Sequence, residues 1–316
     1  MNKRRIFIFL LIFSFLVLER AYPYWIWTPK TRKWTNPKNA VKPTPKEQFD
    51  FAKTFYDAKN YEDAKRELKK LLKSYPKALE AAEGQYYLGL IEETQNNLYE
   101  AYKEFQKVID KYPFSERIPE IIEREYKIAD SFMTGYKRKA LGIALPVENP
   151  AIEILAKVIE NSTYGPLAPQ AQYKLGLVLK GISRYYEAEE AFSKVIKNYP
   201  NSEWVDAAKF QIASCRQSVS RGAEYDQGAS KEAKDQFEEF VREHPDAVLS
   251  QEAEKNIDQL KDKEAESNYN IGRFYEKQGS YDAARLYYND LVNSNPDSSW
   301  AVKAMERLQI MEKRKR

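Results

Sequence analysis

The stretch from Leu175 to Pro200, LGLVLKGISRYYEAEEAFSKVIKNYP, decides the fold of this chain. Its second half carries apolar residues at offsets 0, 3, 7, 10 and 11 from Tyr185, which form one stripe at a 3.6-residue period. This pattern predicts a helix that ends before Pro200, because the residue preceding a proline is pushed out of the α region. The apolar segment around Gly176 predicts a helix before it, so the stretch is a helical hairpin.

The same spacing of small residue, alanine, aromatic residue and proline recurs along the chain. The complete copies place these repeat positions at Gly89, Ala101 and Pro113, at Gly176, Ala188 and Pro200, and at Gly272, Ala284 and Pro296. A first copy, with Ala52, Ala64 and Pro76, has Ala in place of Gly. A helical glycine costs about 0.8 to 1 kcal/mol relative to alanine. We therefore expect close packing, in which a small residue on one helix meets a small residue on the next.

Two further copies carry insertions, Gly135 to Pro150 and Ser218 to Gly228, whose Gly and Pro residues are typical of loops. The chain then holds six units between about Glu47 and Pro296. One hairpin cannot bury both faces of its helices, so the units must stack. The sequence predicts an all-α solenoid of about six helical hairpins plus a C-terminal capping helix.

These hairpins resemble the tetratricopeptide repeat, whose 34-residue unit has the same small, aromatic and proline positions. The first helix of such a repeat usually begins with Trp. Here that place holds a polar amide residue in four copies, Gln48, Gln85, Gln172 and Asn268. In three places a serine follows the terminating proline by two residues and is predicted to cap the next helix, at Ser115, Ser202 and Ser298.

The N-terminus has the composition of a secretory signal. Three basic residues at positions 3–5 precede the thirteen residues 6–18, of which only Ser14 is polar. Glu19 stands where a small residue is preferred for cleavage after Ala21, which leaves a retained anchor open. Residues 1–21 are expected to be a signal peptide or an N-terminal anchor.

Residues 22–46 differ from the rest of the chain, with five of the fifteen prolines and three of the five tryptophans. This composition favours an extended linker over a helix. Its aromatic residues either pack on the first repeat or dock to a partner or to the membrane interface, where Trp and Tyr are favoured. The tetratricopeptide-repeat domain is expected to span 47–312.

The residues that catalysis or metal binding would need are scarce. The only histidine, His244, takes the place held by Tyr75, Tyr112 and Tyr199 before a terminating proline, and the only cysteine is Cys215. No Cys/His dyad, zinc site or glycine-rich phosphate loop can be assembled. Acidic pairs such as Glu189-Glu190 have the character of a solvated helix face. We expect no enzyme, no cofactor and no metal.

The charge balance excludes one class of partner. The formal net charge is +4, and removal of residues 1–21 takes away four basic residues and one acidic residue and leaves +1. A nearly neutral chain lacks the electrostatic footprint of a nucleic-acid-binding protein.

The last unit has an unusually long first helix. From Pro245 to Asn268 is 23 residues, where the usual step is 9, and a Tyr-rich segment ending at Tyr275 follows. A repeat array with this extension resembles the BamD family of outer-membrane β-barrel assembly. The resemblance implies a membrane-associated, non-catalytic scaffold in the periplasm, at the inner face of the outer membrane. Its C-terminal repeats would bind the barrel-forming subunit, and its N-terminal groove would receive unfolded outer-membrane proteins.

Two features depart from that family. Its members are normally lipoproteins, whereas the only cysteine here, Cys215, lies deep in the fifth unit. The arginine that contacts the barrel-forming subunit is replaced by Tyr287, with Arg285 as the nearest basic residue. A periplasmic adaptor for cell division or peptidoglycan synthesis is the alternative function for the same architecture.

Overall fold

The computed structural model describes residues 25–28, 33–35, 40–135, 139–140, 143–144, 149–220 and 227–315. The expected signal peptide or anchor at 1–21 lies outside these residues. The chain divides into two compact units, Met1–Ile118 and Pro119–Arg316.

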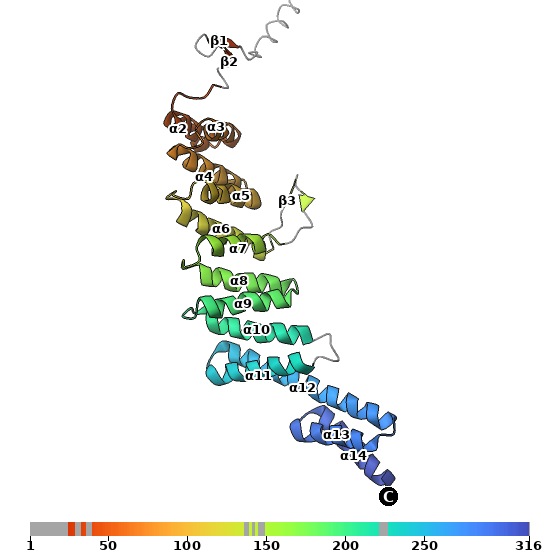
Figure 1. Cartoon of the computed structure of the whole chain (residues 1–316). Helices are drawn as coiled ribbons and strands as arrows, with labels where there is room; N and C mark the ends of the chain where they lie inside the picture. Colours follow the sequence, from red (N-terminus) through yellow and green to blue (C-terminus); the bar gives the residue numbers. More distant parts are fainter. Residues whose placement is uncertain are drawn as a thin grey trace, which may run out of the picture. The chain divides into compact units, whose positions relative to one another are not determined.

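The first unit contains two helical hairpins and a short antiparallel strand pair (Figure 1). The strands are β1 (Ile26–Thr28) and β2 (Lys33–Thr35), and the helices are α2 (Pro45–Asp57), α3 (Tyr61–Ser74), α4 (Leu79–Thr94) and α5 (Leu98–Lys111). Helix α3 packs against α4 as well as against its own partner α2, so the two hairpins share a core. The strand pair lies inside the segment that the sequence predicts to be an extended linker, and α2 begins at Pro45, two residues before the predicted start of the repeats.

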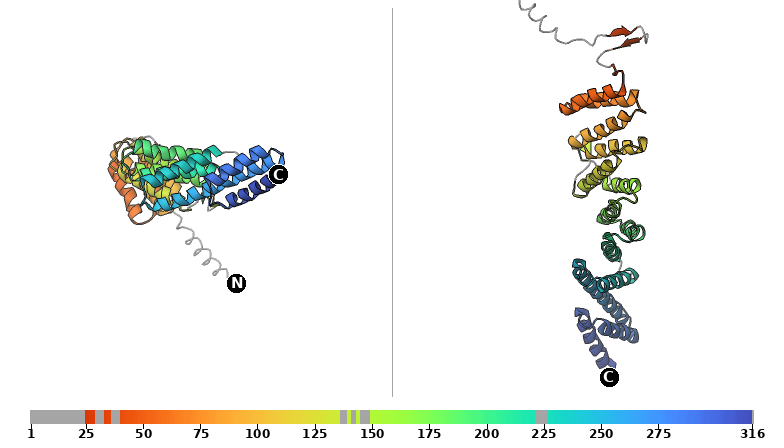
Figure 2. Two further views of the ribbon diagram at one scale, coloured as in Figure 1. Left: turned by 90° about the horizontal axis from the view of Figure 1, so that it is seen from below. Right: turned by 90° about the vertical axis from the view of Figure 1, so that its left-hand side faces the viewer.

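The second unit contains the remaining helices and a second short strand pair. They are α6 (Ile118–Met133), β3 (Lys139–Ala140), β4 (Ile143–Ala144), α7 (Ala151–Asn161), α8 (Ala168–Gly181), α9 (Tyr185–Asn198), α10 (Trp204–Ser220), α11 (Gln227–Glu243), α12 (Val248–Lys277), α13 (Tyr281–Ser294) and α14 (Ser299–Lys315). Helices α8 to α13 follow one another as three packed pairs, α7 packs against α8 ahead of them, and α14 covers the last pair (Figures 1 and 2). Over the described residues, the two units therefore confirm the predicted all-α solenoid of six hairpins and a capping helix.

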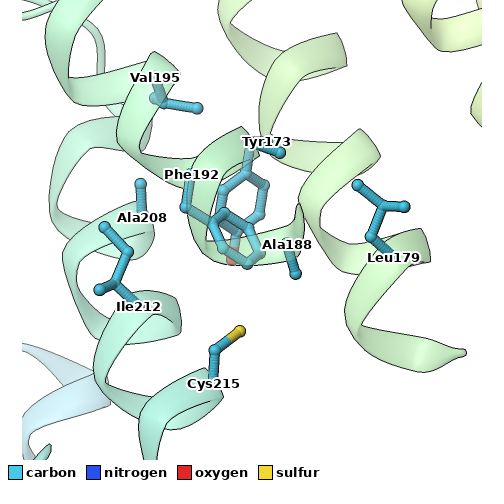
Figure 3. Packing of buried hydrophobic residues seen from close by; sticks show 9 residues of the cluster. Tyr173, Leu179, Ala188, Phe192, Val195, Ala208, Ile212 and Cys215 are labelled. Atoms are coloured by element: carbon cyan, nitrogen blue, oxygen red, sulfur yellow. The ribbon is translucent and has the colours of Figure 1, made fainter. Parts of the chain in front are cut away.

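Each hairpin buries the stripe that its sequence predicts. In α9, Ala188, Phe192 and Val195 are fully buried, and they meet Ala208 and Ile212 of α10 (Figure 3). The aromatic residue lies between two helices of its own hairpin and the first helix of the next. The core is thus continuous from one hairpin to its neighbour, as stacking of repeats requires.

The two insertions differ from the predicted loops in different ways. The first contains the β3–β4 strand pair, in which Ala140 pairs with Ile143. In the second, α10 runs on to Ser220 and α11 begins at Gln227, so the prediction of a loop from Ser218 to Gly228 was wrong at both ends. Residues 221–226 lie outside the described part of the chain.

The ends of the helices follow local rules. The residue before the proline leaves the helical region, as at Tyr199 with φ −132° and ψ 54°. The predicted serine cap forms at Ser298, directly before α14, where Ser298 Oγ accepts a hydrogen bond of 3.0 Å from the Ala301 amide. Ser202 and Ser115 lie two and three residues before α10 and α6, and they accept hydrogen bonds from the amides of Trp204 and Arg117 in the turns that lead into these helices. Between the two helices of a hairpin, one residue adopts a left-handed backbone five positions before the repeat alanine. These residues are Lys59, Asn96, Ser183 and Gly279.

Candidate functional site

The repeat glycines lie against aromatic rings. A Cβ atom at Gly176 would stand 2.5 Å from a ring carbon of Phe192, and one at Gly89 would stand 2.4 Å from the ring of Phe105. Gly272 meets Tyr288 in the same way, at 2.6 Å. The expected contact of a small residue with a small residue is therefore corrected: the glycine makes room for a ring on the second helix.

The other repeat positions lie where the packing needs them. The alanines Ala101, Ala188 and Ala284 have no exposed surface. The prolines Pro113, Pro200 and Pro296 each follow the capping residue of a second helix. These positions hold the hairpins together, and they leave the outer faces of the helices for other contacts.

The polar residues in the place of the usual Trp also hold hairpins together. The amide nitrogen of Gln172 donates to the Ala191 carbonyl at 3.0 Å, and that of Gln85 donates to the Glu104 carbonyl at 3.2 Å. Gln48 makes the same bond to the Glu67 carbonyl at 3.1 Å. In each case the acceptor is 19 residues further along the chain. The sequence shows the glutamines, but their partners become visible only when the hairpin is closed.

Helix α12 spans 30 residues, which confirms the predicted long helix. Its first half, through Ala253 and Ile257, packs in one core with α10 and α11. Its second half, from Ala265 onward, packs in another core with α13 and α14. The helix is therefore long because it belongs to two successive cores.

A buried carboxylate ties the three C-terminal helices together. Glu276 of α12 forms an ion pair with Arg307 of α14, with Arg307 Nε 3.0 Å from Oε2, and it accepts a 3.1 Å hydrogen bond from the Tyr288 hydroxyl of α13. The hydrogen bonds from Arg307 hold the pKa of Glu276 below its usual value. Burial, together with this carboxylate, raises the pKa of Tyr288. Nothing in the local sequence indicates this network, because its members are up to 31 residues apart.

The two residues predicted to contact a partner lie on different sides of α13. Tyr287 stacks on Tyr275 of α12, with ring centroids 5.6 Å apart and planes inclined by 13°. Arg285 forms an ion pair with Asp282 on its own helix. Residues two apart on a helix point about 200° apart, so the structure does not bring Arg285 and Tyr287 together.

The stacked pair continues into an exposed aromatic side chain. Phe274 contacts Tyr275 edge to face at 5.6 Å, and 57% of its surface is exposed. We call Phe274, Tyr275 and Tyr287 the aromatic ledge. A rigid aromatic surface of this kind offers a large contact area to another protein at low cost in side-chain entropy.

The chain's scarce nucleophiles lie in structural positions. Cys215 is buried in the core between α9 and α10, where burial raises the pKa of its thiol to about 11 (Figure 3). The ring of His244 packs against that of Phe240 with the planes inclined by 42°, and its Nε2 is 3.3 Å from a carboxylate oxygen of Asp206. Among the described residues, no group of three or more His, Cys, Asp or Glu side chains could hold a metal ion.

One acidic pair differs from its prediction as a solvated face. Glu189 binds Arg216 of α10 at 2.6 Å, whereas Glu190 pairs with Lys194 on its own helix. Glu189 therefore links two successive hairpins, and only Glu190 lies on an exposed face.

Comparison with known proteins gives two family matches. Residues 150–316, more than half of the chain, match the family model YfiO, described as an outer membrane lipoprotein. Residues 49–116 match a tetratricopeptide repeat model. No curated protein sequence matches the chain at a significant level. No helix in the described ranges combines the length and the apolar character needed to cross a membrane.

Solved structures also match the chain, at low identity and low TM-score. One is the C-terminal part of a tetratricopeptide repeat-containing protein from Cytophaga hutchinsonii, with 18% identity and a TM-score of 0.36 over 83% of this chain and 87% of that one. Another is a tetratricopeptide repeat protein from Parabacteroides merdae, with 15% identity and a TM-score of 0.35 over 83% and 97%. The protein MamA has 21% identity and a TM-score of 0.34 over 64% and 92%.

The YfiO match covers α7 to α14 and therefore includes the long helix, the aromatic ledge and the Glu276 network. The match to the repeat model covers most of α2 to α5 in the first unit. The chain is a tetratricopeptide-repeat protein that belongs to the YfiO family of outer membrane lipoproteins.

Proposed function

We propose that this protein is a non-catalytic periplasmic scaffold for the assembly and insertion of outer-membrane β-barrel proteins. Its C-terminal hairpin binds the barrel-forming subunit, and its N-terminal repeats receive unfolded barrel proteins. Family membership supports the location at the outer membrane. The observation that carries the proposal is the aromatic ledge, an exposed aromatic surface within the matched region.

The ledge is packed against its own helices. Tyr287 and Tyr275 stack on each other, and the neighbouring Glu276 is bound to α13 and α14. A surface whose side chains are already ordered loses little conformational entropy on binding. Phe274 is the member that a partner would cover most completely, because it is the most exposed.

The first unit supports the second binding role. Phe49 and Tyr56 of α2 both contact the ring of Tyr87 in α4 edge to face, at 5.4 and 4.8 Å. All three side chains are only partly buried. Unfolded barrel strands alternate apolar and polar residues, and a row of partly exposed rings across two helices would receive the apolar ones.

Site-directed photo-crosslinking in the native envelope tests both roles. A photo-reactive phenylalanine analogue is placed at Phe274, at Phe49 or at Tyr186 of α9, which is 75% exposed and serves as the matched control. We expect position 274 to crosslink the barrel-forming subunit, position 49 to crosslink unfolded barrel proteins, and position 186 to crosslink neither.

Binding of purified full-length protein to the barrel-forming subunit provides the second measurement. Phe274→Ser is expected to weaken binding, while Tyr186→Ser leaves it unchanged, and neither variant alters the melting temperature. Crosslinks from position 274 to division or peptidoglycan enzymes would support the alternative adaptor function. Recovery of no assembly subunit at any position would refute the proposal.

A further inference from the structure

The β1–β2 strand pair presents a cluster of exposed tryptophans. Trp27 and Trp34 are directly opposite each other in the antiparallel register, and their ring centroids are 5.8 Å apart. Trp25 precedes Trp27 by two residues, the spacing that places side chains on one face of an extended strand. The exposed fractions of Trp25, Trp27 and Trp34 are 59%, 45% and 62%. We call these three residues the Trp cluster.

The two tryptophans of the repeats are not exposed in this way. These two, Trp204 and Trp300, are partly buried and pack on Tyr173 and Tyr269 within the repeats. Large exposed apolar side chains gathered in one place mark a surface that contacts something other than water. Tryptophan is the residue that membrane–water interfaces favour most clearly, because its ring is apolar and its N–H remains available to polar groups.

The formal charge of residues 22–46, which contain the Trp cluster, indicates that the surface they bind is anionic. Residues 22–46 contain six basic residues and no Asp or Glu. They are Lys30, Arg32, Lys33, Lys38, Lys42 and Lys46. Residues 47–316 contain 41 basic and 46 acidic side chains, a formal net charge of −5. An anionic surface would therefore attract residues 22–46, which include the Trp cluster, and would repel the repeats.

The position of this segment in the chain also favours binding to a membrane surface. Residues 22–44 of the segment lie between the apolar run 6–18 and the first repeat helix, which begins at Pro45. Cys215, the only cysteine, is buried in the repeat core, so it cannot carry a lipid in the folded protein. We propose that the Trp cluster, in a segment whose sequence carries a net positive charge, binds the interface of a bilayer that contains anionic phospholipid, and holds the acidic repeats away from it. This proposal does not depend on the partners of the repeats.

Tryptophan fluorescence of the full chain in vesicles tests the proposal. One variant, Trp204→Phe with Trp300→Phe, leaves only the Trp cluster to emit. Its matched control replaces Trp25, Trp27 and Trp34 by Phe and leaves only the repeat tryptophans. Both are reconstituted in vesicles whose acyl chains carry bromine near the headgroup, made of phosphatidylglycerol or of phosphatidylcholine. Circular dichroism checks that both keep the helical fold.

We expect the Trp cluster to be quenched and its emission shifted to the blue, more strongly in phosphatidylglycerol, while the control changes little. Adding Lys30→Gln, Arg32→Gln and Lys33→Gln to the first variant is expected to remove the preference for the anionic lipid. Equal quenching in the two variants would overturn the proposal. So would equal quenching in the two lipids, or a Trp cluster that stays in water on vesicles and is shielded only when the barrel-forming subunit is added.

Discussion

The side-chain amide of Gln172 in α8 donates a 3.0 Å hydrogen bond to the main-chain oxygen of Ala191 in α9. The bond crosses the interface between the two helices of one hairpin, and both residues are buried. Because its equivalents recur at Gln48 and Gln85, it is a property of the repeat in this protein rather than of one hairpin.

Replacement of Gln172 tests the contribution of this bond. Gln172→Ala removes the bond and leaves a space between the helices, and we expect it to lower the free energy of unfolding by about 1 to 3 kcal/mol. Ser193→Ala, at an exposed position of α9, is the control and should change it by less than about 0.5 kcal/mol. Chemical denaturation of both variants measures the difference, and equal midpoints would show that the bond is not stabilising.

The two glycines of α8 are expected to respond oppositely to alanine. Gly176→Ala forces a Cβ against the Phe192 ring and should destabilise the protein by about 1 to 3 kcal/mol, despite the better helix propensity of alanine. Gly181→Ala meets no atom within 4 Å and should stabilise it by about 0.4 to 1 kcal/mol. Melting temperatures of the single variants, of Phe192→Leu, and of Gly176→Ala with Phe192→Leu test the explanation. We expect Gly176→Ala to cost less in the Phe192→Leu background than in the original protein, and an equal cost in both would contradict the explanation.

The Glu276–Arg307 pair predicts a dependence of stability on pH. The pKa of Glu276 lies below its usual value of 4.5 in the folded protein because Arg307 donates hydrogen bonds to the carboxylate. The resulting stabilisation is present above pH 4.5 and is lost as the pH falls through the lowered pKa. Glu276→Gln should therefore reduce the loss of stability on acidification, whereas Glu306→Gln, at an exposed site on α14, should not. Denaturation curves collected across this range measure the effect, and parallel curves for all three proteins would exclude it.

Cys215 offers a chemical test of the core between α9 and α10. Burial raises the pKa of its thiol to about 11, so at pH 8 only about one thiol in a thousand is ionised. We expect iodoacetamide to leave the folded full-length protein unmodified at this pH and to modify it fully in denaturant. Mass spectrometry gives both results. Rapid modification of the folded protein would mean that this core opens readily.

The repeat register could be derived from the sequence because it depends on local properties. The apolar stripe after Tyr185, the proline at position 200 and the serine cap at position 298 act within one or two helical turns. The same local evidence gave an incorrect reason for the glycine at position 176. The sequence shows that a small residue is required there, but only the folded hairpin shows that the ring of Phe192 occupies the space.

The candidate binding surface was predicted only in part. Tyr287 was singled out by the family resemblance and the segment ending at Tyr275 by its tyrosines, whereas their stacking requires α12 and α13 to lie side by side. The pairing of Glu276 with Arg307 had no sequence pattern to reveal it. Residues 31 positions apart are not neighbours on a single helix. Glu276 and Arg307 come into contact only because α14 packs back against α12.

The sequence by itself determined the helical hairpins, their number and their stacking, because periodicity, proline and glycine act through local backbone geometry and through burial of one helix face. It also determined the separation of charge between residues 22–46 and the repeats. Only the tertiary structure decided which side chains meet across helices and which remain exposed. Those contacts join residues distant in the chain, and they include the glutamine bonds, the Glu276 network and the exposure of Phe274.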